Sequence, residues 1–390
     1  MRKIGRRWPT GNDRYSKRIA EFAGSSLVAH WPLNELSGTT AYDISGNGNH
    51  GAITGTTLGQ PGIGDGLYSQ SFDGSTSYID ISAIASNLVT NGGFETAGAG
   101  GADIWANWVE TASDGAVANE TTLIHTGADA AKLTAGSTKS TRTTSAVTVI
   151  PGSTYRYRFW TRGDGTYQGR YAIWNGSLGE WLTAETATGV TGETYTMVDV
   201  EFTIPALTTS LSMGLYCPDT DGGVAYFDTV SLRRTDIPTF DPHEGTILTW
   251  AKVPDWTDGI ISWPVYLGVD AFENAIAISK RDTNNAIQFD YFAKTTETIS
   301  KTSVSETGFM ALGMSWSLSG DAVKGYYNGV QEGSTQTGLG VFSGQLASNR
   351  TLLGARTSTP TQPFTGNEAH AQIYNKALSA DEIAYLSRLP

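Results

Sequence analysis

The chain has 390 residues and a formal net charge of −12 at pH 7, with 46 glycines, 11 tryptophans, 17 tyrosines and only 16% charged residues. This composition is typical of short strands, many turns and aromatic-rich sheet faces, so we expect an all-β protein. An acidic chain repels nucleic acid and anionic membranes, which argues against nucleic-acid binding as the function of the whole protein.

Residues 1–24 form a basic N-terminal segment with seven basic side chains against two acidic ones. The basic residues, which we regard as candidates for docking to a partner, are Arg2, Lys3, Arg6, Arg7, Arg14, Lys17 and Arg18. Polar residues and Pro9 follow the first charges where a signal peptide needs an apolar core, so no signal peptide is expected, and no membrane span is visible. Two interpretations stay open, a solvated tail and a peg that docks on an acidic surface of a larger assembly.

The first strands are expected at residues 27–35 and 71–81, where Asp73 and Gly74 supply a tight turn. Between them, residues 43–48 are rich in oxygen-bearing side chains, as in a calcium loop. Thr54 stands where such a loop needs a bidentate glutamate. Both a calcium site and a turn held by side-chain hydrogen bonds therefore remain open.

A second set of strands begins at Asn87-Leu88-Val89-Thr90-Asn91-Gly92-Gly93-Phe94-Glu95 and ends at residues 223–232. It resembles the jelly-roll carbohydrate-binding modules of families four and nine over residues 86–236. The resemblance implies a structural calcium held by Glu95 and Asp228 together with backbone carbonyls near Gly93 and Lys132. The alternative is that the two carboxylates cap turns.

Alternation along the strands of this segment sorts its aromatic residues into two faces. One face carries Tyr155, Tyr157 and Phe159, which we expect to lie in the core. We expect one concave sheet to present a sugar-binding surface, with indole rings that stack on sugars and guanidinium groups that bind hydroxyls or acidic sugars. The candidate ligand-binding residues are Arg156, Arg158, Trp160, Arg170 and Trp174, with Trp181 on the rim. The alternative is that Trp160 and Trp174 fill the sandwich.

The chain returns to the first set of strands at residue 245, and Asn328-Gly329 predicts a hairpin turn. In the closing segment, which begins at residue 363, Ser379 with Glu382 predicts a capping box and a short terminal helix. Together with residues 25–85, residues 237–390 resemble the laminin-G-like, concanavalin-type lectin/glucanase sandwich. One departure is that residues 368–371 read Glu-Ala-His-Ala where relatives carry Ile-Asp-Glu-Val. The fold expected is therefore two jelly-roll β-sandwiches, with residues 86–236 inserted into a sandwich made of residues 25–85 and 237–390.

Catalytic motifs are not apparent. The Glu-x-Asp-x-x-Glu carboxylate run of glycosidases on this scaffold is not found, and neither is a nucleophile elbow. The single cysteine, Cys217, lies in an apolar strand and reads as a buried, inert thiol, and the histidines show no spacing typical of zinc ligands. We therefore expect a non-catalytic, extracellularly displayed recognition protein that binds glycans and docks to a larger assembly. The alternative is a structural or decoration protein of a bacteriophage virion, whose sandwiches serve as spacers.

Overall fold

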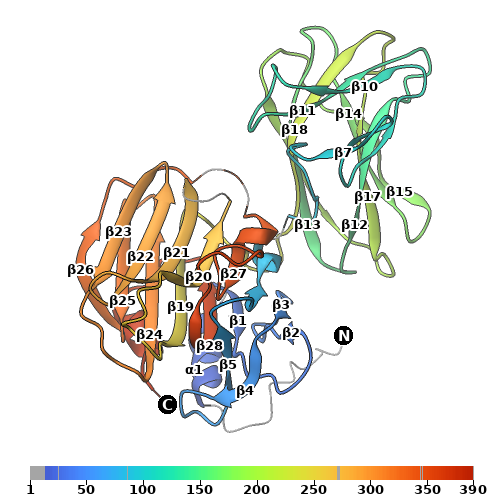
Figure 1. Ribbon diagram of the computed structural model, residues 1–390. Helices are drawn as coiled ribbons and strands as arrows, with labels where there is room; N and C mark the ends of the chain where they lie inside the picture. Colours follow the sequence, from blue (N-terminus) through green and yellow to red (C-terminus); the bar gives the residue numbers. More distant parts are fainter. Residues whose placement is uncertain are drawn as a thin grey trace. The chain divides into compact units, whose positions relative to one another are not determined.

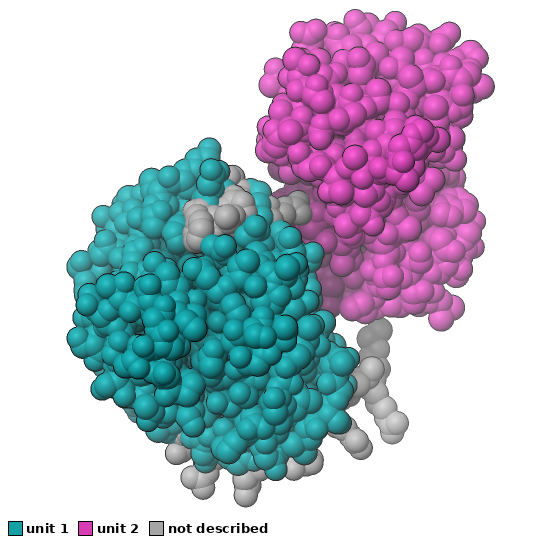
Figure 2. All heavy atoms as spheres, in the orientation of Figure 1, with its two compact units in different colours: residues 1–85, 237–390 teal, residues 86–236 magenta. Residues whose placement is uncertain are grey.

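The computed structural model describes residues 14–24, 26–85, 87–269, 273–342, 344 and 346–389. The chain divides into two compact units, one formed by Met1–Ala85 with Ile237–Pro390 and the other by Ser86–Asp236 (Figure 2). These divisions fall at the domain boundaries drawn from the sequence. We call the first the outer unit and the second, which interrupts its sequence, the inner unit.

The outer unit contains two antiparallel sheets (Figure 1). The first has the strand order β26-β25-β24-β19-β28-β5-β4, and β1 also pairs with β28. Its strands are β1 (Leu27–Trp31), β4 (Thr57–Pro61), β5 (Tyr68–Asp73), β19 (Glu244–Lys252), β24 (Phe309–Ser317), β25 (Ala322–Tyr327), β26 (Val330–Gln336) and β28 (Thr365–Tyr374).

The second sheet of the outer unit has the order β2-β3-β6-β27-β20-β21-β22-β23. Its strands are β2 (Thr40–Ala41), β3 (Gly51–Thr54), β6 (Tyr78–Asp80), β20 (Ser262–Gly268), β21 (Asn274–Arg281), β22 (Ala286–Ala293), β23 (Thr295–Lys301) and β27 (Thr351–Leu353). Both sheets contribute alternate residues to one apolar core. Ile287, Phe289 and Tyr291 of β22 belong to it, as do Trp31 and Trp316.

The turns predicted from the sequence form as expected. At Asn328 and Gly329 the φ angles are 49° and 80°, the positive values that a two-residue hairpin turn requires. The Asp73 carboxylate accepts hydrogen bonds from the backbone of Ser75 and Thr76. In the loop that begins at Asp43, the carboxylate binds backbone N–H groups in the same way, which supports the turn interpretation of that loop.

Two α-helices, α1 (Arg14–Ala23) and α2 (Ala380–Leu386), contribute to a second apolar cluster on the first sheet. Leu248 and Trp250 of β19 belong to this cluster, whereas their neighbours Ile247 and Ala251 point into the main core. The predicted capping box of α2 is confirmed, because Ser379 accepts a bond from the Glu382 backbone and donates its own N–H to the Glu382 side chain. Among the described residues, no helix is both long and apolar enough to cross a membrane.

The expectation that residues 1–24 form an arm or tail is wrong for the part that the structure describes. Tyr15 and Ile19 are buried in the second apolar cluster, and Tyr15 donates a hydrogen bond to the Leu386 carbonyl. Arg18, one of the expected docking residues, donates to the Arg388 carbonyl, while Lys17 is exposed. The described segment is therefore an integral helix of the outer unit. Arg2, Lys3, Arg6 and Arg7 lie outside the described residues, as does the side chain of Arg14.

The inner unit is a sandwich of two five-stranded antiparallel sheets, with a small hairpin of β7 and β8. Sheet one has the order β10-β11-β18-β13-β16 and sheet two the order β15-β14-β17-β12-β9. The strands are β7 (Ala97–Gly100), β8 (Asp103–Trp105), β9 (Val109–Thr111), β10 (Ala116–Glu120), β11 (Ala130–Thr134), β12 (Arg142–Thr148), β13 (Thr154–Arg162), β14 (Arg170–Asn175), β15 (Glu180–Ala187), β16 (Thr196–Thr203), β17 (Ser210–Tyr216) and β18 (Val224–Arg234).

The two ends of the inner unit are held together by hydrogen bonds. The Leu88 N–H donates to the Leu232 carbonyl at 2.9 Å. The Asn87 side chain accepts from the Leu232 N–H at 2.8 Å and donates to the Val230 carbonyl at 3.1 Å. The chain therefore enters and leaves this unit at one place, as an inserted domain requires.

We expect the outer unit to fold without the inner unit, because its core residues all come from its own two segments. Replacing residues 86–236 by a short Gly/Ser linker should retain one cooperative thermal transition in calorimetry. The separately produced segment 86–236 should supply the transition that the excised chain has lost. Excision that abolishes cooperative melting would contradict this expectation.

We also expect Ile19 to contribute to the stability of the outer unit. Truncating this fully buried side chain in Ile19→Ala should lower the free energy of unfolding by about 2–5 kcal/mol, because it leaves a cavity under α1. The exposed neighbour provides the control, since Lys17→Ala should change stability by no more than ~0.5 kcal/mol. Urea denaturation measures both, and equal stabilities would show that α1 is not part of the folded core.

Candidate functional site

Sheet two of the inner unit presents the candidate functional surface. Tyr171 and Ile173 of β14 point into the core, so Ala172 and Trp174 alternate with them on the outward side. On the neighbouring β17, Leu211, Met213 and Leu215 are core, and the outward side carries small residues. The outward residues that characterise this surface, which we call the tryptophan face, are Ala172, Trp174, Trp181, Ser212 and Gly214.

Trp174 and Trp181 form the aromatic part of the tryptophan face. They stand opposite each other on β14 and β15, and their rings meet edge to face with centroids 4.9 Å apart and planes 77° apart. Trp181 is 46% exposed and Trp174 is half-buried. Each ring fixes the orientation of the other, and an aromatic surface remains open to solvent.

Tyr216 bounds the other end of the tryptophan face. It stands opposite Arg170 on one side and Arg142 on the other, and each guanidinium carbon lies 5.9 Å from the centre of its ring. A Cβ atom on Gly214 would lie only 2.6 Å from this ring, so glycine is needed there for the tyrosine to pack flat on the strand. Tyr216 is 5% exposed and serves as a base for the two arginines.

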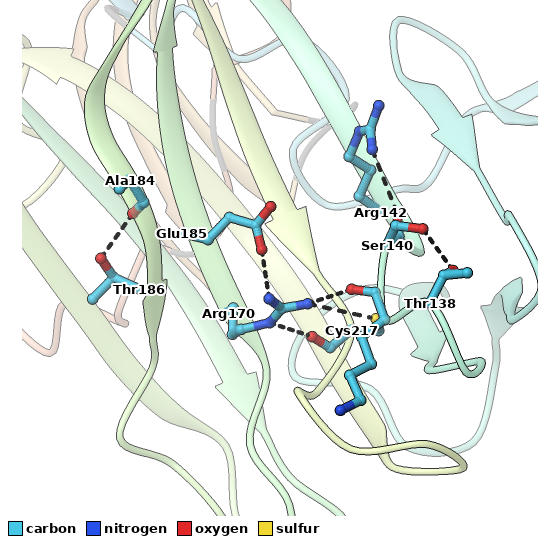
Figure 3. Close-up of polar contacts among 9 residues, drawn as sticks. Thr138, Ser140, Arg142, Arg170, Ala184, Glu185, Thr186 and Cys217 are labelled. Carbon is cyan, nitrogen blue, oxygen red and sulfur yellow. Dashed lines mark hydrogen bonds and ion pairs between the residues drawn. The ribbon is translucent and has the colours of Figure 1, made fainter.

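Arg170 is fully engaged by the protein (Figure 3). Its guanidinium group donates to the Glu185 carboxylate, to the Cys217 carbonyl at 3.0 Å and to the Lys139 carbonyl. It therefore connects β14 to β15 and to two loops, and it has little capacity left for a ligand. Cys217 is buried as predicted, and burial raises the pKa of its thiol, which leaves it a poor nucleophile.

The expectation that Arg156, Arg158, Trp160, Arg170 and Trp174 line one surface is wrong. β13, which carries the first three, belongs to sheet one, whereas β14 belongs to sheet two. Because both sheets turn one side to the common core, the outward sides of β13 and β14 face opposite directions. The alternative, that Trp160 and Trp174 fill the sandwich, is also wrong, since both are only half-buried and outside the core cluster.

On sheet one, the predicted binding residues are occupied by other side chains. The Trp160 ring is stacked on His125, with centroids 4.0 Å apart and planes 17° apart. Arg156 pairs with Glu201 at 2.8 Å, and Arg158 pairs with Asp199 at 2.9 Å, across β13 and β16. This arrangement makes sheet one a weaker candidate for ligand binding than the tryptophan face.

Glu95 and Asp228 both bind the backbone of one loop. Asp228 is buried and accepts N–H bonds from His125 at 2.8 Å and Thr126 at 2.9 Å. Burial raises the pKa of Asp228, although these bonds act against the increase. Glu95 accepts from the Ala128 N–H at 3.0 Å. Because N–H donors stand where a cation would need to be, these contacts support the turn-capping interpretation, and calcium binding stays a prediction.

The outer unit contains a buried polar cluster that sequence reasoning missed. His370 Nε2 lies 2.6 Å from Asp65 Oδ2, and His370 Nδ1 lies 3.1 Å from His30 Nε2. Burial lowers the pKa of His30, and the neighbouring His370 lowers it further. Burial opposes ionisation of Asp65, but the hydrogen bond to His370 keeps the Asp65 pKa below its usual value. One ring nitrogen of His370 thus contacts His30 and the other contacts Asp65. Among the described residues, no group of three or more His, Cys, Asp or Glu can hold a metal ion.

Glu368, two residues before His370 on β28, is buried without a hydrogen-bond partner for either carboxylate oxygen. It is the first residue of the segment that departs from the family pattern. Burial raises the pKa of Glu368 well above its usual value. Ionisation of this side chain is therefore disfavoured in the folded protein.

Residues 221–384 match the family described as the concanavalin A-like lectin/glucanases superfamily. This match confirms the resemblance of the outer unit to that superfamily. No curated protein matches the chain.

Solved structures similar to the chain include carbohydrate-binding modules. TmCBM61 in complex with β-1,4-galactotriose is 20% identical, with a TM-score of 0.30, over 38% of this chain and 98% of that one. The CBM40 of the Ruminococcus gnavus IT-sialidase, bound to α2,3-sialyllactose, is 14% identical, with a TM-score of 0.31, over 37% and 83%. The enzymatically active domain of bacteriophage CBA120 tailspike protein 4 is 17% identical, with a TM-score of 0.30, over 38% and 21%. At this level, the similarities assign neither a ligand nor an activity to the chain.

The burial of Glu368 predicts how the stability of the folded chain depends on pH. The unfolded chain loses this proton above the ordinary pKa of 4.5, whereas the folded chain retains it to higher pH. Below about pH 4.5 Glu368 carries its proton in both the folded and the unfolded chain, so its protonation does not affect stability. Above that pH, keeping the proton lowers the free energy of unfolding by ~1.4 kcal/mol per pH unit until the folded pKa is reached. Glu368→Gln removes the ionisable group, so the variant should gain stability over the natural chain as pH rises from 5 to 8.

Urea denaturation of both chains across this pH range measures the difference. The exposed Glu21→Gln provides the control, and its stability should run parallel to that of the natural chain. A constant difference between Glu368→Gln and the natural chain would show that Glu368 ionises normally in the fold.

Proposed function

We propose that this chain is a non-catalytic glycan-binding protein and that its binding surface is the tryptophan face of the inner unit. The observation that supports this most directly is the Trp174–Trp181 pair, which is oriented by its own edge-to-face contact and left open to solvent. The apolar C–H faces of sugars stack on such rings, and a rigid ring loses little conformational entropy when it binds.

The residues next to the tryptophan pair also suit a flat ligand. Ala172 and Gly214 stand side by side in the register of β14 and β17, and Ser212 stands opposite Trp174. Ser212 is partly exposed and leaves room for a ligand beside the indole rings, whereas Ala172 and Gly214 are buried and Gly214 lies under the Tyr216 ring. On the opposite outward surface, on sheet one, one face of the Trp160 ring is covered by His125.

The carboxylates near these surfaces do not favour glycoside hydrolysis. That reaction needs one carboxylic acid to donate a proton and a second carboxylate as nucleophile or base. Glu185, at the edge of the tryptophan face, is engaged with Arg170. Asp199 and Glu201 are paired with arginines on the other sheet. These pairings support a binding role without catalysis.

Display at a cell or virion surface and attachment through the basic residues before α1 remain part of the proposal. Tyr15 and Ile19 are buried, so such attachment is left to the residues that precede the helix and to the exposed Lys17. Deleting residues 1–13 tests the part of this attachment that precedes the helix and leaves the sequence of α1 intact. Loss of attachment to the native assembly would support the proposal, and full retention would contradict it.

Replacing either indole of the tryptophan face should weaken glycan binding. Trp174→Ala and Trp181→Ala should each lose ~1–3 kcal/mol of binding free energy, about ten- to hundredfold in affinity, because the stacking surface is removed. Trp160→Ala is the matched control on the other sheet and should bind like the natural chain. A glycan array followed by titration calorimetry measures all three, with circular dichroism to confirm folding. Loss of binding in Trp160→Ala alone, or no glycan bound by the natural chain, would contradict the proposal.

A further inference from the structure

At the Tyr216 end of the tryptophan face, some basic side chains form ion pairs and others do not. Arg170 is neutralised by Glu185, whereas among the described residues no ion pair reaches Arg142 or Lys139. Arg142 has one long hydrogen bond, from Nη1 to the Ser140 carbonyl at 3.5 Å (Figure 3). The Asp114 carboxylate accepts hydrogen bonds from the hydroxyls of Ser137 and Thr138, which lower its pKa and keep it ionised, but among the described residues it forms no ion pair with Arg142 or Lys139. Two basic side chains at this end of the face are therefore left without an ion-pair partner in the part of the chain that the structure describes, on a chain whose net charge is −12.

The Arg142 side chain is also held in place. Its guanidinium group lies over the Tyr216 ring, and that ring is fixed against Gly214 and flanked by Arg170 on the other side. A planar guanidinium group supported on a ring keeps its N–H edge free for an acceptor. Carboxylates match this edge because two parallel hydrogen bonds can form at once.

The strand register places Arg142 on the same surface as the tryptophan pair, diagonally across β17. Arg142 stands opposite Tyr216, and Trp174 stands opposite Ser212, four residues earlier on the same β17 strand. Four residues of β-strand span about 13 Å along β17, and the two strand spacings from β14 to β12 add about 10 Å across the sheet. A short oligosaccharide stacked on Trp174 and Trp181 would extend over the Tyr216 ring, which lies against Gly214, and bring a neighbouring sugar to Arg142.

We propose that the tryptophan face selects glycans that carry a carboxylate, such as a uronic or sialic acid, and that Arg142 is the residue that recognises this group. The inference rests on the proposed function, since it assumes that a glycan stacks on Trp174 and Trp181. It assigns the specificity to one guanidinium group, because Arg156, Arg158 and Arg170 are each paired with an acid in the fold.

The test compares acidic oligosaccharides with the same compounds after reduction of their carboxylates to alcohols. One set contains uronic acids and the other contains sialic acid, so the two sources of a carboxylate are distinguished. The natural chain should bind at least one acidic compound about ten- to hundredfold more tightly than its reduced counterpart, and added salt should diminish the preference. Arg142→Gln should bind the acidic compound no better than the reduced one.

Arg162→Gln is the matched control, because Arg162 also lies over a tyrosine ring, that of Tyr226, but on sheet one. It should keep the preference for the acidic compound. Equal binding of acidic and reduced compounds by the natural chain would overturn the inference while leaving the proposed function intact. A preference that survives in Arg142→Gln would overturn the role of Arg142. Failure of the natural chain to bind any glycan on the array would overturn both.

Discussion

The packing of two sheets around one core determines which residues of the inner unit can meet a ligand. Each strand must turn alternate side chains inward, as Tyr155, Tyr157 and Phe159 do on β13 and Tyr171 and Ile173 do on β14. The remaining residues face outward, and the sheet to which a strand belongs decides on which side of the sandwich they lie. The Trp174–Trp181 pair and the Arg142–Tyr216–Arg170 row share a surface because β15, β14, β17 and β12 are neighbours in one sheet.

Features encoded by local sequence were predicted correctly. Alternation identified the core side of β13, the spacing of Ser379 and Glu382 identified the cap of α2, and Asn328-Gly329 identified a hairpin turn. Sheet membership could not be predicted in this way. β13 pairs with β16 and β18, and β14 pairs with β15 and β17, so partners come from distant parts of the chain and the local pattern is the same for either sheet. Trp160 was therefore grouped with Trp174 although they lie on opposite sides.

In the outer unit, the N-terminal helix α1 packs on the first sheet although its basic residues suggested a solvent-exposed arm. The basic residues of the N-terminal segment suggested an arm, but Tyr15, Ile19 and Phe22 recur at helical spacing and pack on the first sheet. Tyr15 also contacts His370 edge to face at 4.6 Å, which places α1 directly over the His30–His370–Asp65 cluster. No sequence signal indicated this cluster, because its members come from three segments that only the fold brings together. A satisfied buried network of this kind favours one packing over its alternatives.

The central claim, that glycans bind at the tryptophan face, is tested most directly by the indole N–H signals of the tryptophans in a ¹H–¹⁵N NMR titration. The full chain would be titrated with the oligosaccharide that gives the strongest signal on a glycan array, and the signals assigned by single substitutions. Saturable shifts of the Trp174 and Trp181 signals, with that of Trp160 unchanged, are the result that the account predicts. Shifts confined to Trp160 or to tryptophans of the outer unit would contradict it.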